Sequence, residues 1–375
     1  NTSLAQTGNI TTVSAHDASQ IDSLAGAVGV AQNAGIGAAI AVNRVGTDVT
    51  AYLDGGADNR QYHAGEVTVS ASGTNRNADD SANIRTIAIG IGGGVDVGGA
   101  ASVAVNLIDG DITSRIGNGA NVLAENNVAV LAENRQGIDV FAGSAGISLM
   151  RAGIGLGAVV NEITGDTSAL ISGSTTQVSA LAKGDGRSVS NGSLANPDAV
   201  NAMDLENVED YVAPDLGFGT TLVNGIAVNA ASAQHVTSLG ASLALSFNPK
   251  GSFALAAISG TNVLGGTTTA GIVGARIHQA AGAASDQTVD VRAGSHVMSA
   301  NFIFGAAGGT TDVGATAAIA STVFDQGTSA YLRNATVDAA QDVNVSAEAS
   351  QNSVAIAAGV AGAIVGGAAR GGVNL

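Results

Sequence analysis

The sequence of 375 residues lacks cysteine and tryptophan altogether. Without cysteine the chain can form neither disulfides nor thiolate metal sites. It has only two lysines, Lys183 and Lys250, and its 14 basic residues stand against 30 acidic ones, which gives a net charge of −16. Nucleic acids and anionic membranes are bound by clustered lysine and arginine. The charge therefore argues against both as partners, and we expect no nucleic-acid binding.

Long apolar runs are scarce as well. The longest, 354–369, has 16 residues that are mostly alanine and glycine, whereas a membrane-spanning helix needs about 20 strongly apolar residues. We therefore interpret this run as a buried strand and expect no membrane insertion. Residues 1–20 have neither a basic start nor an apolar run, so they do not resemble a signal peptide.

The composition that remains favours a folded chain. There are 53 glycines, 45% of the residues are apolar and only 12% are charged. Disordered chains combine low hydrophobicity with high charge, and this one has the opposite balance. We therefore expect an ordered structure built largely from small and apolar side chains.

One five-residue phrase, Val-x-Val-x-Ala or a close variant, recurs along the chain. Recurrence at this interval indicates an array in which each unit buries its apolar face against the next. The last residues, 373–375, repeat 105–107 from the middle of a unit, so we interpret the chain as an excerpt of a longer array. The central valines of the copies are Val13, Val69, Val130, Val178, Val228, Val291 and Val345, separated by 56, 61, 48, 50, 63 and 54 residues.

Apolar residues alternate within the units, as in Ile87, Ile89 and Ile91, and this period of two indicates strands. We predict an all-β fold, a parallel β-helix or solenoid of degenerate 50–60-residue repeats. A unit can form one long coil with strands of about 10 residues or three short coils, and uninterrupted runs such as 84–108 favour the long coil. Glycine and alanine inside the runs allow opposed sheets to lie closer than the ~10 Å of an ordinary sandwich.

An asparagine recurs after valine at the end of the small-residue runs. Stacked amides can form a hydrogen-bonded ladder inside a solenoid, and we expect a structural ladder of Asn43, Asn106, Asn161 and Asn374. The alternative is that these residues serve only as turn formers that tolerate positive φ.

The repeat is suspended between residues 183 and 222. The chain therefore divides into solenoid repeats over 1–182, an irregular acidic insertion over 183–222, and continued repeats over 223–375. Two of the three prolines, Pro197 and Pro214, lie in the insertion. A short helix can begin at 196–197 and end before Pro214, because residues at near-helical spacing lie between them.

Insertions in repeat arrays are usually displayed on one face and often do the binding. The acids and one tyrosine of this segment suit a basic partner or a divalent cation, although the spacing is not that of an EF-hand loop. The alternative is a solvated insertion that covers an edge. The binding candidates are Asp198, Asp204, Glu206, Glu209, Asp210, Tyr211 and Asp215.

Signals for catalysis are sparse. Polysaccharide lyases and hydrolases need clustered acids with lysine or arginine on one face, and no nucleophile elbow, dinucleotide fingerprint or P-loop occurs. The five histidines lack the i, i+4 partners of a zinc site. We expect no enzyme, no metal and no cofactor. The acids outside the insertion fall mostly at turns: Asp96, Asp109, Asp111, Glu162 and Asp166.

The whole repeat reads as a small-residue run ending in Val-Asn, then Thr/Ser-x-Ala-x-Leu/Ile, a glycine turn and Val-x-Val-x-Ala. It resembles the repeat of very large secreted adhesins of Gram-negative bacteria, the filamentous haemagglutinin and leukotoxin-type group, over most of the chain outside 183–222. The resemblance implies a β-helical fibre exported by type V secretion through an outer-membrane pore and held at the cell surface.

We therefore predict a segment of an extracellular bacterial adhesin, a stiff stalk that displays loops for attachment to host or bacterial cell surfaces. Virulence and biofilm formation are the settings that the resemblance implies. One alternative is a self-assembling filament or biofilm-matrix subunit, in which copies stack end to end. A second is a β-helical enzyme that acts on polysaccharides.

Overall fold

The computed structural model describes residues 4–5, 9–56, 60–73, 82–195, 217–248, 251–277, 281–310, 313–365, 368–371 and 373–374. Across these ranges every regular element is a strand, and the pairing between successive units is parallel. The prediction of an all-β chain with parallel sheets is confirmed for this part of the chain. No helix within it is long and apolar enough to cross a membrane.

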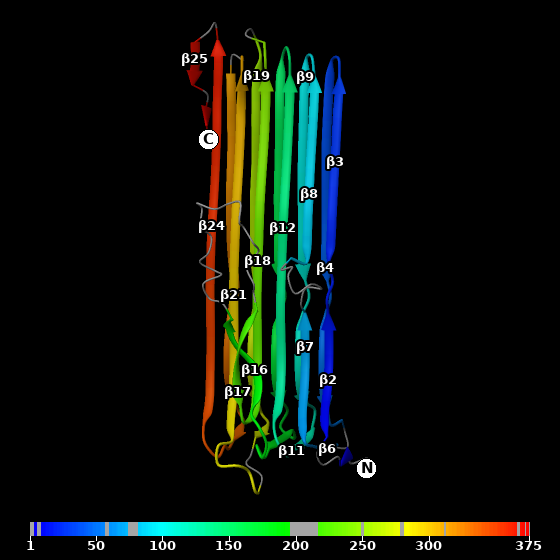
Figure 1. The fold of residues 1–375 in the computed structure, drawn as a ribbon, viewed down its shortest axis with the longest axis vertical. Helices are drawn as coiled ribbons and strands as arrows, with labels where there is room; N and C mark the ends of the chain where they lie inside the picture. The colour runs from blue at the N-terminus through cyan, green and yellow to red at the C-terminus, as the bar shows by residue number, and fades with distance from the viewer. Residues whose placement is uncertain are drawn as a thin grey trace.

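Each unit runs out along one sheet, turns tightly, and returns along a second. The outward strands form the front sheet, the returning strands form the return sheet, and a short strand then joins a third, short sheet (Figure 1). In the first two units the outward and return paths are each broken once. Their strands are β1 (Leu4–Ala5), β2 (Ile10–Asp17), β3 (Ile21–Ala31), β4 (Ala34–Gly46), β5 (Val49–Asp54), β6 (Gln61–Ala64), β7 (Glu66–Gly73), β8 (Ile84–Gly94), β9 (Val97–Asp109), β10 (Ile112–Gly117) and β11 (Asn121–Ala124).

From the third unit onward the outward path is one uninterrupted strand of 21 to 23 residues. These strands are about twice as long as the long-coil interpretation expected. The remaining strands are β12 (Val128–Ser148), β13 (Ala152–Thr164), β14 (Thr167–Ser172), β15 (Gln177–Ala180), β18 (Gly225–Ser246), β19 (Phe253–Val273), β20 (Arg276–Ile277), β21 (Thr288–Gly309), β22 (Val313–Arg333), β23 (Thr336–Val337), β24 (Val343–Val365), β25 (Ala368–Gly371) and β26 (Val373–Asn374).

The recurring phrase sets the register of the front sheet. Six of its central valines lie side by side on successive strands: Val13, Val69, Val130, Val228, Val291 and Val345. The seventh, Val178, is in the short sheet, between Val122 and Ile277. The step from the third front strand to the fourth is therefore 98 residues, from 130 to 228, and it contains the insertion. Register also aligns the fourth unit, which the sequence alone left unaligned.

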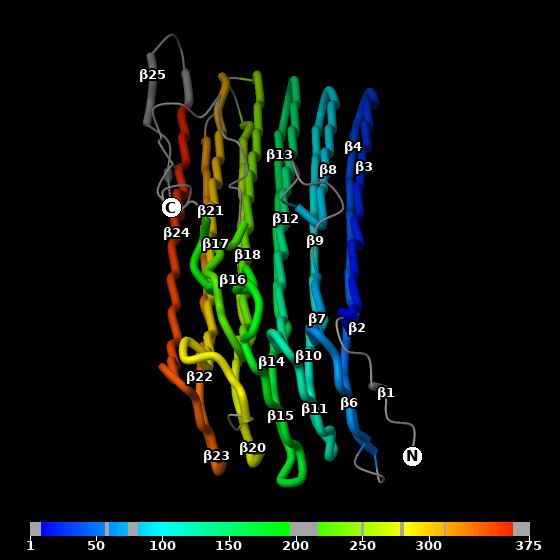
Figure 2. Tube along the Cα trace, turned by 60° about the horizontal axis from the view of Figure 1, so that its bottom comes forward, coloured from blue at the N-terminus to red at the C-terminus, as the bar shows by residue number. Residues whose placement is uncertain are grey.

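The two ends of the molecule are packed differently, and the tube view in Figure 2 shows the short sheet confined to one of them. In this proximal half, three sheets enclose a core of valine, isoleucine, leucine and alanine that runs through successive units. In the distal half, only the front and return sheets face each other, and the residues between them are mainly glycine, alanine, serine and threonine. The proximal half is therefore an apolar prism and the distal half a thin slab.

The two sheets of the distal slab are in backbone contact. A Cβ atom placed on Gly92 would lie 1.7 Å from the carbonyl oxygen of Gly99, and one on Gly98 would lie 1.8 Å from that of Ile147. Real atoms do not approach this closely, so only glycine fits at these positions. The close sheet approach expected from the composition is present, and it is confined to this half.

The flanks of the insertion are regular, contrary to the expectation of an irregular segment over 183–222. Strands β16 (Arg187–Leu194) and β17 (Phe218–Val223) pair in antiparallel fashion with a register shift between Ser190 and Leu194. Alternation is weak here because glycine, serine, asparagine and threonine dominate both strands, which hid them from the sequence pattern. The expected short helix at 196–214 falls outside the described residues.

The backbone contact between the sheets predicts that alanine substitution of two neighbouring glycines on β9 has very different effects on stability. Gly98→Ala should destabilise the fold by about 1–3 kcal/mol, because its methyl group meets the backbone of β12. Gly99→Ala is the matched control: its Cβ would point out of the slab, 3.5 Å from the Ile36 side chain, and should change stability by less than about 0.5 kcal/mol. Urea unfolding measures both. Equal effects would contradict the inward assignment of Gly98.

Candidate functional site

The predicted binding residues Asp198, Asp204, Glu206, Glu209, Asp210, Tyr211 and Asp215 all lie outside the described residues. What the structure does describe is the hairpin of β16 and β17 from which their segment leaves and to which it returns. Figure 1 shows this hairpin in front of the proximal half of the front sheet. The hairpin thus fixes the place on the array at which the segment emerges.

The hairpin is packed onto the outer face of the front sheet. Val189 and Val223 pack on Ala129 and Ala227, and farther along Leu194 and Phe218 pack on Ala231 and Ala233. These alanines expose flat backbone on which larger side chains can lie. The hairpin therefore buries apolar area on a sheet face that would otherwise be open to solvent.

Polar contacts tie the same hairpin to three different units. Arg187 forms an ion pair with Glu66 of β7. At the other end, the carbonyl oxygen of Gly192 lies 2.7 Å from His296 Nε2 on β21, and the Ser193 hydroxyl donates to Glu348 on β24 at 2.9 Å. These contacts anchor the hairpin to several units of the array.

Charged residues are enclosed where the hairpin covers the sheet. Burial raises the pKa of Glu133, an effect that nearby Arg135 opposes. Arg135 in turn lies over the Phe218 ring, 5.1 Å from its centroid. At Asp139 burial also acts to raise the pKa, but His235, with its Nε2 3.6 Å from the carboxylate, and the nearby Thr237 and Arg85 hold that pKa below its usual range. Titratable groups with shifted pKa values thus lie at the border between the covered and open parts of the front sheet.

A buried ladder of asparagines crosses the return sheet. Asn43 donates to Asn106 at 2.9 Å, Asn106 to Asn161 at 2.8 Å, and Asn161 to Asn262 at 2.9 Å. Sequence reasoning missed Asn262, which follows threonine instead of valine; the Asn-x-Val/Ile/Leu sequence that leads into a glycine at 43, 106 and 161 also occurs there. Asn374 is not in the ladder: it pairs with Thr316, whereas the ladder position on β22 holds Thr322.

Hydroxyl groups of the front sheet complete this ladder. Thr86 donates to Asn106 at 2.6 Å, Ser238 donates to Asn262 at 2.7 Å, and the Ser299 hydroxyl accepts from Asn262 at 3.0 Å. The four asparagines and these three hydroxyls form a polar seam that joins the two sheets. Buried amides are costly when unpaired, and the seam pairs them between units as well as between sheets.

The polar seam marks a change in what the interior contains. On its proximal side lies a layer of bulky residues, including Ile84, Ile108, Ile138 and Ile163. On its distal side most inward residues are small, such as Ala41, Ala88 and Ala104. Most large side chains of the distal half point outward instead, as Ile36, Ile40 and Leu24 do. Ile258 and Ile303 are inward exceptions, and they lie against glycines of neighbouring strands. The slab is therefore apolar on its outer faces and small or polar within.

Four of the five acids weighed as catalytic candidates accept backbone amides or pair with arginines. Asp111 accepts from the Asp166 amide at 2.9 Å, and Asp166 accepts from the Thr267 amide at 2.8 Å. Arg44 donates to Asp109 and holds the pKa of that carboxyl below its usual range. Asp96 lies 3.5 Å from Arg151 at the distal turn. Glu162 lies on β13, at the proximal border of the outer face of the return sheet.

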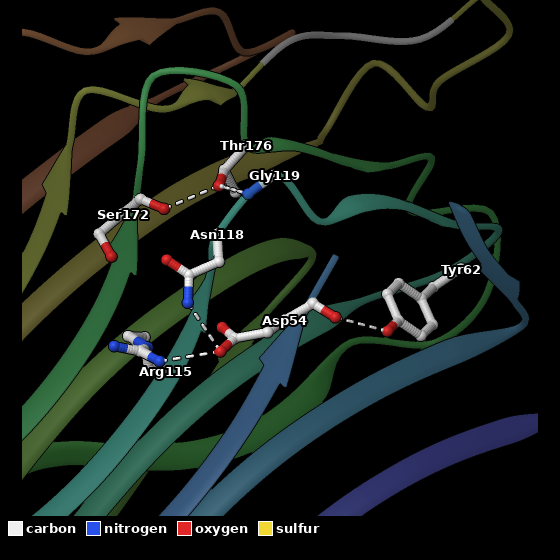
Figure 3. A network of polar contacts seen from close by, with 7 residues as sticks. All are labelled: Asp54, Tyr62, Arg115, Asn118, Gly119, Ser172 and Thr176. Carbon is white, nitrogen blue, oxygen red and sulfur yellow. Dashed lines mark hydrogen bonds and ion pairs between the residues drawn. The ribbon is translucent and has the colours of Figure 1, made fainter. Parts of the chain in front are cut away.

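A second set of turn contacts closes the corner between the return and short sheets (Figure 3). The Asp54 carboxylate accepts from Arg115 at 2.9 Å and from Asn118 at 2.8 Å, and its carbonyl accepts from the Tyr62 hydroxyl at 2.8 Å. Asn118 has a φ of 47°, a left-handed conformation that asparagine tolerates. The corner is held by side chains from successive units.

Histidine and acid positions bring no metal centre together within the described ranges, where no group of three or more such residues has suitable geometry. His16 lies 2.9 Å from the Ser72 hydroxyl, and His296 bridges Ser350 and Gly192.

The chain was compared with family models, with characterised proteins and with solved structures, and none of the three comparisons produced a match.

The polar seam predicts a strong effect of its central member. Asn106→Ala should lower the free energy of unfolding by about 1–3 kcal/mol, because it leaves the side-chain amide oxygen of Asn161 and the hydroxyl proton of Thr86 unpaired in the interior. It also removes one of the two acceptors of the Asn43 amide. Asn33→Ala, at an exposed distal turn, is the control and should stay within about 0.5 kcal/mol of wild type. Urea titration distinguishes the two. Equal losses would contradict a stabilising seam.

The raised pKa of Glu133 predicts a pH-dependent stability. A carboxyl whose folded pKa exceeds its unfolded pKa stabilises the fold fully below the unfolded value, and this contribution is lost as the pH rises through the folded value. Glutamine does not ionise, so Glu133→Gln avoids this loss of stability. The variant should be more stable than wild type at neutral pH, and the two should have nearly equal stability at about pH 4. Thermal unfolding across this range measures the difference. A constant difference would contradict the prediction.

Proposed function

We propose that the chain is a segment of an extracellular attachment protein, built as a parallel β-solenoid that extends by adding units and presents its insertion at the surface. The observation that carries this proposal is the register between units. Strand β18 pairs with β12 and with β21 along almost its full length of 22 residues. Continuous pairing of this kind suits extension, because each added unit covers the open edge of the one before it.

The side chains that could be reactive support a structural role. Asp48, Asp111 and Asp166 each hold the backbone of the next unit at one bend, and the asparagines pair with one another. Chemistry on a substrate needs groups whose hydrogen bonds are available for it. Acids that hold the turns of an array are already engaged in its folding.

Display of the 183–222 insertion is the second element of the proposal. Its hairpin is anchored to β7, β21 and β24, so a force on the segment between its strands would be passed to several units at once. We place the contact with a cell surface in that segment, on the seven acidic and tyrosine candidates named from the sequence. Secretion to the surface of a Gram-negative bacterium belongs to the same proposal and is supported by the resemblance of the repeat.

The proposal predicts attachment that depends on the insertion. Beads coated with the chain should adhere to host or bacterial cells, and replacing residues 196–216 by a Gly/Ser linker of equal length should remove most of that adhesion. The hairpin and the array remain unchanged in this variant, and circular dichroism checks that its strand content is retained.

Two results would count against this function. Failure of the wild-type beads to adhere to any cell type would overturn an attachment role. Equal adhesion of both forms would keep attachment but remove the insertion as its contact. A matched linker variant at 57–59, between β5 and β6, tests whether adhesion is lost through a loop change of any kind.

A further inference from the structure

The distal half of the front sheet has an outer face made only of apolar residues, which we call the distal face. Its residues lie in four rows across the strands, and each row is in register from one unit to the next. The rows are Leu24, Ile87, Phe141, Leu239, Phe302, Ile356; Gly26, Ile89, Gly143, Ala241, Phe304, Ala358; Val28, Ile91, Ala145, Leu243, Ala306, Val360; and Val30, Gly93, Ile147, Leu245.

Polar residues border this face at both ends. The adjoining row on the proximal side contains Asp22, Arg85 and Asp139 on neighbouring strands. On the distal side the strands end at turns that contain Gln32 and Asp96. The change from apolar to charged side chains therefore occurs at the same level on β3, β8 and β12. On β18, β21 and β24 the same row continues with Thr237, Ala300 and Val354.

The distal face is not flat, because it contains a depression beside projecting side chains. An open depression of about 370 Å³ lies over Gly143 and Ala241, with Phe141, Leu243 and Phe304 among the residues that line it. Beside it the side chains of Leu239 and Phe304 are 39% and 41% exposed. A surface that carries a hollow next to projecting apolar side chains can fit a partner with the same relief.

The outer face of the return sheet is also apolar on β4, β9 and β13, where Ile36, Ile40 and Leu156 are exposed. At the corresponding level, however, Ser259 and Thr261 lie on β19, and Ser321 lies on β22. These hydroxyls interrupt the apolar surface and would require hydrogen-bond partners if they were buried. The uninterrupted apolar surface of the front sheet therefore extends over more strands.

We propose that the distal face binds the distal face of a second copy of this chain. Six strands at about 4.8 Å and four rows at about 6.6 Å make a face of roughly 29 by 26 Å, or ~750 Å² for each copy. The pair would cover ~1,500 Å², which lies within the range of stable specific interfaces. A contiguous apolar surface of this extent is uncommon on a protein that stays alone in solution.

The hairpin of β16 and β17 limits how the copies can meet. It stands on the outer face of the same sheet, over Ala231 and Ala233, on the proximal side of the distal face. A copy lying parallel would bring hairpin against hairpin and hold the two distal faces apart. A two-fold arrangement with the copies antiparallel brings the distal faces together and leaves both hairpins outside the contact. The interface is then isologous, because the same surface of each copy takes part.

A lipid bilayer is the other occupant with matching apolar chemistry, and the experiments below distinguish it from a second copy of the chain.

This inference does not depend on attachment to cells, and sedimentation tests it separately. The wild-type chain should sediment as a dimer at tens of micromolar. Leu239→Lys places a charge in the first row of the distal face and should weaken the dimer at least tenfold. Leu156→Lys, at a residue 43% exposed on the return sheet, is the matched control and should leave the dimer intact.

Ala241→Lys, in the depression, provides a second variant in case Leu239→Lys does not fold, and it should also give monomers. A monomeric wild-type chain, or equal loss of dimer in Leu156→Lys and Leu239→Lys, would overturn the proposal. Flotation with vesicles of neutral phosphatidylcholine tests whether the distal face binds lipid. If the wild-type chain binds the vesicles, Leu239→Lys does not, and no dimer forms in solution, the face is a lipid-binding surface and the dimer proposal is overturned.

Discussion

The in-register pairing of each unit with the next is the constraint on which the rest of the structure depends. Parallel pairing places every residue beside its counterpart, so a side chain that suits one unit must suit its neighbours as well. Hence valine lies beside valine in the front sheet, asparagine beside asparagine in the return sheet, and aspartate beside aspartate at the bend. The stacked aspartates each accept a backbone amide of the next unit, and the stacked asparagines donate and accept along the ladder, so that the benefit of each pair repeats from unit to unit.

The distance between the two sheets follows from this repetition and determines where the large side chains lie. Glycines such as Gly92 and Gly98 allow the backbones of the distal slab to touch, which leaves little interior for large side chains. Each strand still alternates, so the excluded side chains occupy the outer faces. The polar seam sits where the sheets begin to separate, with alanines on one side and isoleucines on the other. Along a single strand, most large side chains therefore lie on the inner face before the seam and on the outer face beyond it.

Much of the architecture could be predicted from the sequence, because period-two alternation and a recurring phrase are direct consequences of stacked strands. The ladder at Asn43, Asn106 and Asn161 was visible for the same reason. Three features were not. Val178 matched the phrase but belongs to the short sheet, since five residues cannot distinguish two strands of similar composition. The hairpin at 187–194 and 218–223 lacks bulky residues that alternate. Alternation also does not say which of its two faces is inward, because that depends on how closely the sheets approach.

The 98-residue step between Val130 and Val228 has a consequence for how such a chain can change over generations. Between β15 and β18 the polypeptide leaves the array, forms a hairpin of its own, and returns to the next position with the pairing of β12 and β18 intact. The junction after a short-sheet strand is therefore a point at which foreign sequence can be spliced in at little cost to its neighbours. A segment of this length can therefore enter the array without changing the register of the strands on either side of it.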